Sequence, residues 1–263
     1  MPPAYAGVRL ERHGAALVEL VLDRPTAMNA VSRALAGAIT AATAELAADS
    51  DVRVVVLSSA AERAFCVGAD LKERNRASDE DLFAQRPVSR AAYRGVLDLP
   101  VPVIAAVHGF ALGGGLELAL SCDVVVADET AVLGLPEVSV GVIPGGGGTQ
   151  LLARRVGWSR AADLIFNARR VDAAESYRLG LVDRLVPGGE ARTAALELAG
   201  VMAANSPVGV RNAKRAMRLG LDVDLATGLE VEDACWRATA FSRDRREGVA
   251  AFNDKRRPDW PGE

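Results

Sequence analysis

Continuous apolar runs recur along the chain, and each is followed by a loop and then by a helical pattern. The clearest runs are VRVVVLSSA (52–60), VPVIAAVHG (101–109) and DVVVAD (123–128). Unbroken apolar runs of this length are typical of strands covered on both faces, as in a parallel sheet flanked by helices. The sequence therefore predicts an α/β protein.

The segments around these runs extend the same pattern. Residues 8–22 read as two strands joined at a glycine turn, and Ser32 is a plausible N-cap for an alanine-rich helix that runs to about Ala48. A charged helical stretch covers residues 71–97, and from Ser159 onward the pattern is almost entirely helical. An α/β core with a helical appendage follows. Periodicity alone does not show how these strand and helix units are arranged in space. A doubly wound sheet is the default expectation.

Composition narrows the classes of function. The chain has 263 residues, half of them hydrophobic, and a formal net charge of −3, which suits one large domain and argues against a nucleic-acid surface. Three scattered cysteines indicate reduced thiols and a cytoplasmic location. The N-terminus lacks a signal-peptide pattern, and polar residues interrupt every apolar stretch short of a membrane span. Two histidines are too few for a multi-histidine metal site.

The stretch FALGGGLELALSCD (110–123) combines two features that a stable helix should avoid. Each glycine inside a helix costs ~1 kcal/mol relative to alanine, and Glu117 interrupts an otherwise apolar run. Glycines at a helix N-terminus would let a substrate oxygen approach the unpaired N–H groups there, as in an oxyanion hole. Tight packing of the helix on a strand explains the glycines equally well, and a salt bridge to an arginine is the common fate of a buried glutamate.

Two further segments can complete a site. AFCVGAD (64–70) is predicted as a loop after a buried strand, where the N–H of Ala69 can be a second oxyanion donor. GLPEVSVGVIPGGGG (134–148) offers a second carboxylate, Glu137, ahead of another glycine run. Two carboxylates beside two N–H donors can carry out acid and base steps on a polarised carbonyl. The alternatives are a solvated charge at Glu137 and an ordinary flexible turn for the glycines.

These residues resemble a known family. FCVGADLKE, VIAAVHGFALGGGLELALSCD and LPEVSVGVIPGGGGTQ, in this order, resemble the enoyl-CoA hydratase/isomerase (crotonase) family, and most closely its branch with methylglutaconyl-CoA hydratase, also described as an AU-rich-RNA-binding homologue. The similarity runs from LDRPTAMNA to SRDRREGVAAFNDKR. It implies a spiral of strand-strand-helix units over residues 1–200 and a helical region over 201–263 for trimer contacts. It replaces the default of a doubly wound sheet.

The resemblance also implies the site. The thioester oxygen of an acyl-CoA would lie between the N–H groups of Ala69 and Gly114, and Glu117 and Glu137 would be the acid/base pair. Residues Ala69, Asp70, Leu71 and Lys72 would line the CoA chain, and Gly145 would lie beside the bound water. No metal or redox cofactor is expected, because coenzyme A arrives as part of the substrate.

The expected activity is that of a hydro-lyase, which adds water reversibly across the 2,3 double bond of a 2-enoyl-CoA. Glu117 would activate the water and Glu137 would supply the proton. Isomerase, methylglutaconyl-CoA hydratase and decarboxylase chemistry remain alternatives, since the fold hosts all of them. An RNA-binding protein is a less favoured alternative, and a catalytically silent assembly partner is a third. A homotrimer or a dimer of trimers is the expected assembly, without a membrane or nucleic-acid partner.

Overall fold

A computed structural model describes residues 5–263. Its strands are β1 (Val8–His13), β2 (Leu17–Leu22), β3 (Val54–Ser59), β4 (Ala64–Cys66), β5 (Val103–Val107), β6 (Phe110–Leu112), β7 (Val124–Asp128), β8 (Val132–Gly134), β9 (Arg170–Asp172) and β10 (Arg184–Val186). Its helices are α1 (Arg33–Ala48), α2 (Leu71–Arg74), α3 (Asp79–Leu97), α4 (Gly114–Leu120), α5 (Gly148–Val156), α6 (Trp158–Phe166), α7 (Ala173–Leu179), α8 (Ala191–Ala203), α9 (Pro207–Gly220), α10 (Leu225–Ala240) and α11 (Arg243–Asn253), with 3₁₀ turns at η1 (Pro25–Ala27) and η2 (Glu137–Val140).

From β3 to β8, successive strands alternate between two sheets. One sheet has the order β1-β2-β3-β5-β7-β10, and the other has the order β4-β6-β8-β9. Each repeat contributes its first strand to the larger sheet and its second to the smaller one, as β3 with β4, β5 with β6 and β7 with β8. The chain therefore advances as a spiral of strand-strand-helix units, which confirms the fold that the resemblance implies and not a doubly wound sheet.

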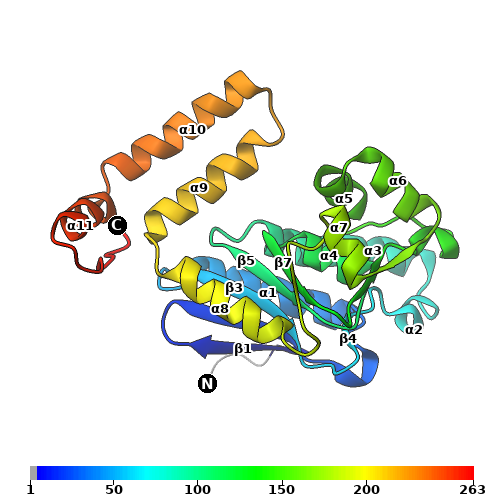
Figure 1. Ribbon diagram of the computed structural model, residues 1–263. Helices are drawn as coiled ribbons and strands as arrows, with labels where there is room; N and C mark the ends of the chain where they lie inside the picture. The colour runs from blue at the N-terminus through cyan, green and yellow to red at the C-terminus, as the bar shows by residue number, and fades with distance from the viewer. Residues whose placement is uncertain (1–4) are drawn as a thin grey trace.

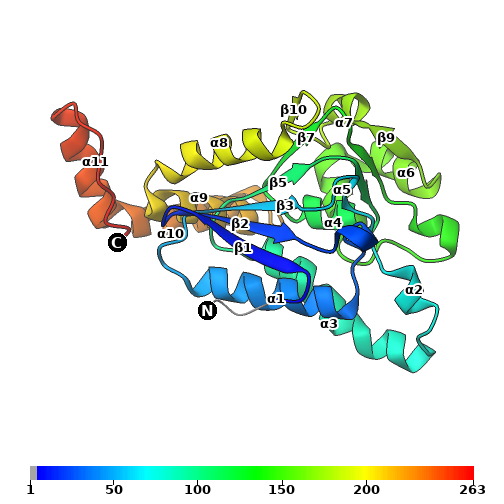
Figure 2. The ribbon, with the colours of Figure 1, turned by 90° about the horizontal axis from the view of Figure 1, so that it is seen from below.

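Helices cover both faces of the larger sheet (Figure 2), with α8 on one face and α1 and α3 on the other. The smaller core, between α8 and the sheet, includes Val54, Ile104 and Ala199. The larger core on the opposite face joins α1 to the strands through residues such as Leu35 and Leu57. Burial on both faces explains why the strands β3, β5 and β7 read as unbroken apolar runs.

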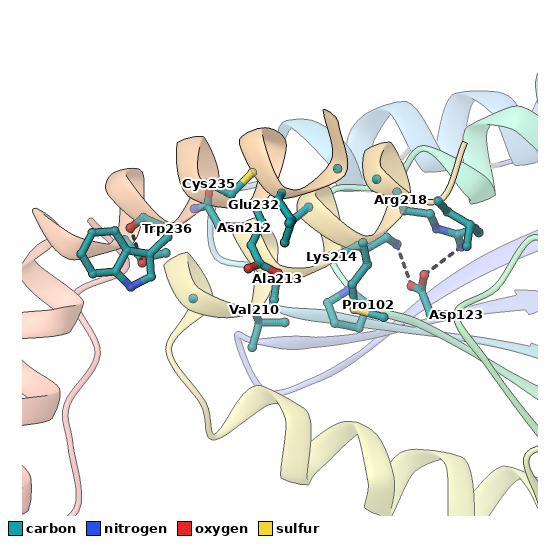
Figure 3. A pocket seen from close by; sticks show the side chains of 18 of the residues that line it. Pro102, Asp123, Val210, Asn212, Ala213, Lys214, Arg218, Glu232, Cys235 and Trp236 are labelled. Atoms are coloured by element: carbon teal, nitrogen blue, oxygen red, sulfur yellow. Dashed lines mark hydrogen bonds and ion pairs between the residues drawn. The ribbon is translucent and has the colours of Figure 1, made fainter. Parts of the chain in front are cut away.

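The last three helices form an arm that projects from the sheets (Figure 1). α9 and α10 lie antiparallel to each other, and α11 lies at the far end. Asp123, just ahead of β7, anchors α9 to the sheet by accepting hydrogen bonds from Lys214 Nζ at 2.7 Å and Arg218 Nη2 at 2.8 Å (Figure 3). Beside this ion cluster lies a largely apolar groove of about 1040 Å³, which is lined mainly by α9 and α10.

Several local predictions differ from the structure. The segment predicted as a loop at 64–70 begins with strand β4, whose fully buried residues pair with β6. The charged stretch 71–97 divides into α2 and α3, because Ser78 caps a new helix through a capping box with Asp81. Strand β9 interrupts the region predicted as helical after Ser159. Within residues 5–263 no helix combines the length and apolar character needed to cross a membrane.

Candidate active site

The three glycines at the start of α4 have three different surroundings. Gly113, the N-cap, has φ 52°, a left-handed conformation that favours glycine. A Cβ on Gly115 would overlap the backbone carbonyl of Cys66, so this glycine lets α4 pack closely on β4. Gly114 is the first residue of the helix, where the backbone N–H has no partner within the helix. One glycine thus allows close packing of α4, and another leaves a backbone N–H available as a donor.

Ala69 lies in a loop that packs on this helix end. Val31 N donates to Gly68 O at 2.7 Å and Asp70 N donates to Val31 O at 3.1 Å, so the residues on either side of Ala69 carry the bridge to Val31. Because N–H groups alternate in direction along an extended chain, the N–H of Ala69 points away from Val31. A Cβ on Gly68, which has φ 88°, would lie 3.0 Å from Gly114 N. The loop therefore brings Ala69 next to the start of α4.

Glu117 is buried but not ion-paired. Its side chain is on the first turn of α4 and the residue is 3% exposed. Oε1 accepts hydrogen bonds from Gly146 N at 2.6 Å and Gly148 N at 2.8 Å. Burial raises the pKa of this carboxyl, and the two N–H donors oppose the rise. The salt bridge considered from sequence is absent among the described residues, and backbone donors of the second glycine run take its place.

Glu137 begins the turn η2 and lies against the same helix end. Its Oε1 is 2.9 Å from the position that a Cβ on Gly113 would take, and its Oε2 is buried without a hydrogen-bond partner in the described chain. Burial raises the pKa of Glu137 to about 7, and the nearby charge of Glu117 adds to the rise. Glu137 is therefore not the solvated loop charge that the sequence left open.

The remaining predicted residues lie around this centre. Asp70 caps α2, accepting from Glu73 N at 3.2 Å, and Leu71 and Lys72 are exposed on that short helix. Gly145 begins the glycine run, and its carbonyl accepts a hydrogen bond from Arg86 Nη2 at 2.7 Å. The structure thus brings all the predicted site residues to one region, where the ends of β4, α4 and η2 meet.

Sequence reasoning missed the contribution of α3 and singled out none of the arginines. Arg86, on α3, reaches the glycine run, and the charges of Arg86 and Arg74 both lower the pKa of Glu117 against the effect of burial. Tyr93, also on α3, packs its ring beside Gly114 and Gly146. Arg86 and Tyr93 are seven residues apart and so share one face of the helix, a spacing that could have indicated them once Gly145 was suspected.

A separate cluster of possible metal ligands consists of Glu11, His13 and Glu19. Arg192 donates to Glu19 Oε2 at 2.6 Å and to Glu11 Oε2 at 3.2 Å, and His13 Nε2 lies 2.9 Å from Glu19 Oε2. The cation of Arg192 therefore already compensates these carboxylates. The cluster joins α8 to the first hairpin and belongs to the framework of the fold.

Comparisons with known proteins agree with this arrangement. The family model for enoyl-CoA hydratase/isomerase matches residues 12–263. The human mitochondrial methylglutaconyl-CoA hydratase is 42% identical over 97% of this chain and 76% of its own length. The mouse mitochondrial enoyl-CoA hydratase domain-containing protein 2 is also 42% identical, over 94% of this chain and 84% of its own.

Solved structures give the same result. The crystal structure of an enoyl-CoA hydratase from Bacillus anthracis superposes with a TM-score of 0.96 at 40% sequence identity, covering 98% of this chain and all of that one. The match extends over the spiral and the C-terminal helices together. The chain thus belongs to the enoyl-CoA hydratase/isomerase (crotonase) family of enzymes.

Proposed function

We propose that this enzyme is an enoyl-CoA hydratase, which adds water reversibly across the 2,3 double bond of a 2-enoyl-CoA to give a 3-hydroxyacyl-CoA. The observation that carries the proposal is the pair of glutamates, Glu117 and Glu137, held close enough that the charge of one raises the pKa of the other. Members of the family that catalyse hydration need both an acid and a base, and this site offers both carboxylates beside two N–H donors.

The surroundings of the two carboxylates support a division of roles. Two N–H donors favour the charged form of Glu117, which suits a base that activates water for attack on C3. Glu137 has a pKa of about 7 and an unpartnered Oε2, which suits an acid that delivers a proton to C2. The N–H groups of Ala69 and Gly114 would bind the thioester oxygen as it gains negative charge.

Two acyl groups are candidates for the substrate. A straight short chain needs only the apolar walls of the site. A branched chain with a distal carboxylate, as in the name of the human relative, needs a cation near the reacting atoms. Arg74 and Arg86 meet that need, since both act on the charge of Glu117. We favour a short-chain 2-enoyl-CoA and keep 3-methylglutaconyl-CoA as the second candidate.

A spectrophotometric assay tests the activity. Purified protein is mixed with crotonyl-CoA or 3-methylglutaconyl-CoA, and the absorbance of the conjugated thioester is followed. We expect Glu117→Gln and Glu137→Gln each to lower kcat by about 10²–10⁴-fold, the usual contribution of acid or base catalysis. Glu129→Gln, at an exposed site after β7, is the control and should keep wild-type activity. A wild type that turns over neither thioester, or glutamine variants that retain full activity, would contradict the proposal.

We further propose that no metal or redox cofactor takes part, because proton transfers and an oxyanion hole suffice for hydration. Activity should therefore persist after dialysis against EDTA. We also propose a cytoplasmic location, which the three unpaired, buried cysteines support, although the mammalian relatives are named as mitochondrial. The net charge of −3 speaks against nucleic acid as a partner.

The proposed assembly is a homotrimer or a dimer of trimers formed through α9–α11. Large apolar side chains crowd the surface of this arm, among them Leu221, Leu225, Trp236 and Phe252. Large exposed apolar patches are typical of protein–protein interaction sites. The groove that α9 and α10 line adds further apolar surface to the same region (Figure 3).

A further inference from the structure

Tyr93 is the residue through which α3 reaches the active site. Ala92, Tyr93 and Val96 are the buried residues of α3, whereas the N-terminal half of the helix is largely exposed. Tyr93 is 7% exposed and lies in the second half of the helix. Tyr93 is neither one of the two proposed catalytic glutamates nor one of the two proposed N–H donors. The place of its aromatic ring in the site therefore has another cause.

The ring fills the space between two parts of the site. Its Cδ2 and Cε2 atoms are each 2.7 Å from the position that a Cβ on Gly146 would occupy. At the other end, Cζ is 3.4 Å from the Cβ position of Gly114, and the hydroxyl oxygen is closer still. The ring thus spans from the start of α4 to the glycine run whose N–H groups hold Glu117.

The ring also lies beside the reacting groups. Oε2 of Glu117, the oxygen that does not accept from Gly146 or Gly148, is 2.8 Å from the same Cβ position on Gly146. In the proposed reaction the thioester oxygen lies at Gly114 and C3 lies near Glu117. Because the Tyr93 ring lies against both Gly114 and Gly146, it would border the acyl group of a bound substrate.

The hydroxyl of Tyr93 lies against the start of α4, next to the position that a Cβ on Gly114 would take. Burial and the nearby carboxylates raise its pKa, so the phenol stays neutral. A neutral ring wedged between two glycines acts on a substrate mainly through its volume.

We propose that Tyr93 is a specificity-determining residue, whose ring limits the length of the acyl chain and restricts the enzyme to short-chain 2-enoyl-CoA thioesters. This inference rests on the proposed hydratase function. It assigns to α3 the choice of acyl group, while the two glutamates and the two N–H donors carry out the reaction.

The test measures kcat/KM for straight 2-enoyl-CoA thioesters with four and eight acyl carbons. Tyr93→Ala and Tyr93→Leu enlarge the site, and the second keeps more of the buried volume in case the first fails to fold. Tyr93→Phe keeps the ring and removes the hydroxyl. Tyr177→Leu, at an exposed position on α7, is the matched control.

The expected readout is the ratio of the eight-carbon to the four-carbon kcat/KM. It should rise at least about 10-fold in Tyr93→Ala and Tyr93→Leu, since one methylene in an apolar pocket is worth about 10–200-fold. Tyr93→Phe and Tyr177→Leu should keep the wild-type ratio. An unchanged ratio in the Ala and Leu variants, or an equal rise in Tyr93→Phe, would overturn the inference while leaving hydratase activity intact. A wild type inactive on every thioester would instead overturn the proposed function, and this inference with it.

Discussion

At the scale of single residues, two glutamates of the same type are given different properties by their neighbours. Glu117 accepts two backbone hydrogen bonds, whereas Oε2 of Glu137 is buried without one. Nothing in the residue type distinguishes them. The difference arises from the glycine run, whose N–H groups converge on one carboxylate and not on the other. The different properties of the two glutamates are therefore set by backbone N–H groups of glycines, not by other side chains.

The raised pKa of Glu137 predicts how stability depends on pH. The folded-state pKa is about 7, above the ordinary 4.5, so folding favours the protonated carboxyl. That stabilisation is complete below about pH 4.5 and is lost as the pH rises through 7. The wild type should therefore lose stability as the pH rises, whereas Glu137→Gln should not. From pH 5 to pH 8, the unfolding free energy of Glu137→Gln should rise by about 1–2 kcal/mol relative to that of the wild type, after allowance for solvent screening.

Urea denaturation of the two proteins at pH 5, 6, 7 and 8 measures this difference. Glu129→Gln is the control, because its exposed side chain should give a difference that does not change with pH. A constant difference between Glu137→Gln and the wild type across the range would show that the carboxyl titrates normally in the folded protein.

At the scale of elements, the sequence predicted the long, regular pieces and missed several of the short ones. The strands of the large sheet were predicted because burial on both faces leaves an unbroken apolar run. Strands β4, β6 and β9 have three residues each, too few for any periodicity to appear. Glu117 and Glu137 were indicated by type and setting, but Tyr93 was not, because a tyrosine in a helix is usually a core residue.

The packing of α4 on β4 predicts the effect of one substitution. A Cβ on Gly115 would overlap the Cys66 carbonyl, which is backbone and cannot rotate away. Gly115→Ala should therefore lose about 3 kcal/mol or more of unfolding free energy, the upper range for overpacking. Gly37→Ala, in α1 with nothing within 4 Å of the new Cβ, is the matched control and should gain about 0.5–1 kcal/mol. Thermal unfolding of the two variants and the wild type measures these differences in stability. A Gly115→Ala protein as stable as the wild type would contradict the close contact.

At the scale of the whole molecule, the arm α9–α11 is fixed to the body by polar contacts but leaves many apolar side chains exposed. The ion cluster of Asp123, Lys214 and Arg218 holds the C-terminal half of α9 at the edge of the sheet. At the other end, Trp260 Nε1 donates to Ala204 O at 2.8 Å, and Gly262 N donates to Asp244 Oδ1 at 2.7 Å. Polar anchors at both ends fix the direction of the arm, while the apolar side chains between them are left on the surface.

That arrangement predicts that a single charged side chain, introduced into the apolar surface of the arm, prevents assembly. Leu225 begins α10, lines the groove and is 79% exposed in the single chain, so its side chain contributes little to the fold of one protomer. Leu225→Asp would bury an unpaired carboxylate in the proposed interface, which costs several kcal/mol per subunit and should shift the protein to monomers at micromolar concentration. Phe166→Asp, at a 69% exposed position on α6, is the control and should sediment like the wild type. Sedimentation velocity measures both, with circular dichroism to show that the variants are folded. A wild type that sediments as a monomer, or a Leu225→Asp variant that still forms the wild-type species, would remove the arm as the site of assembly.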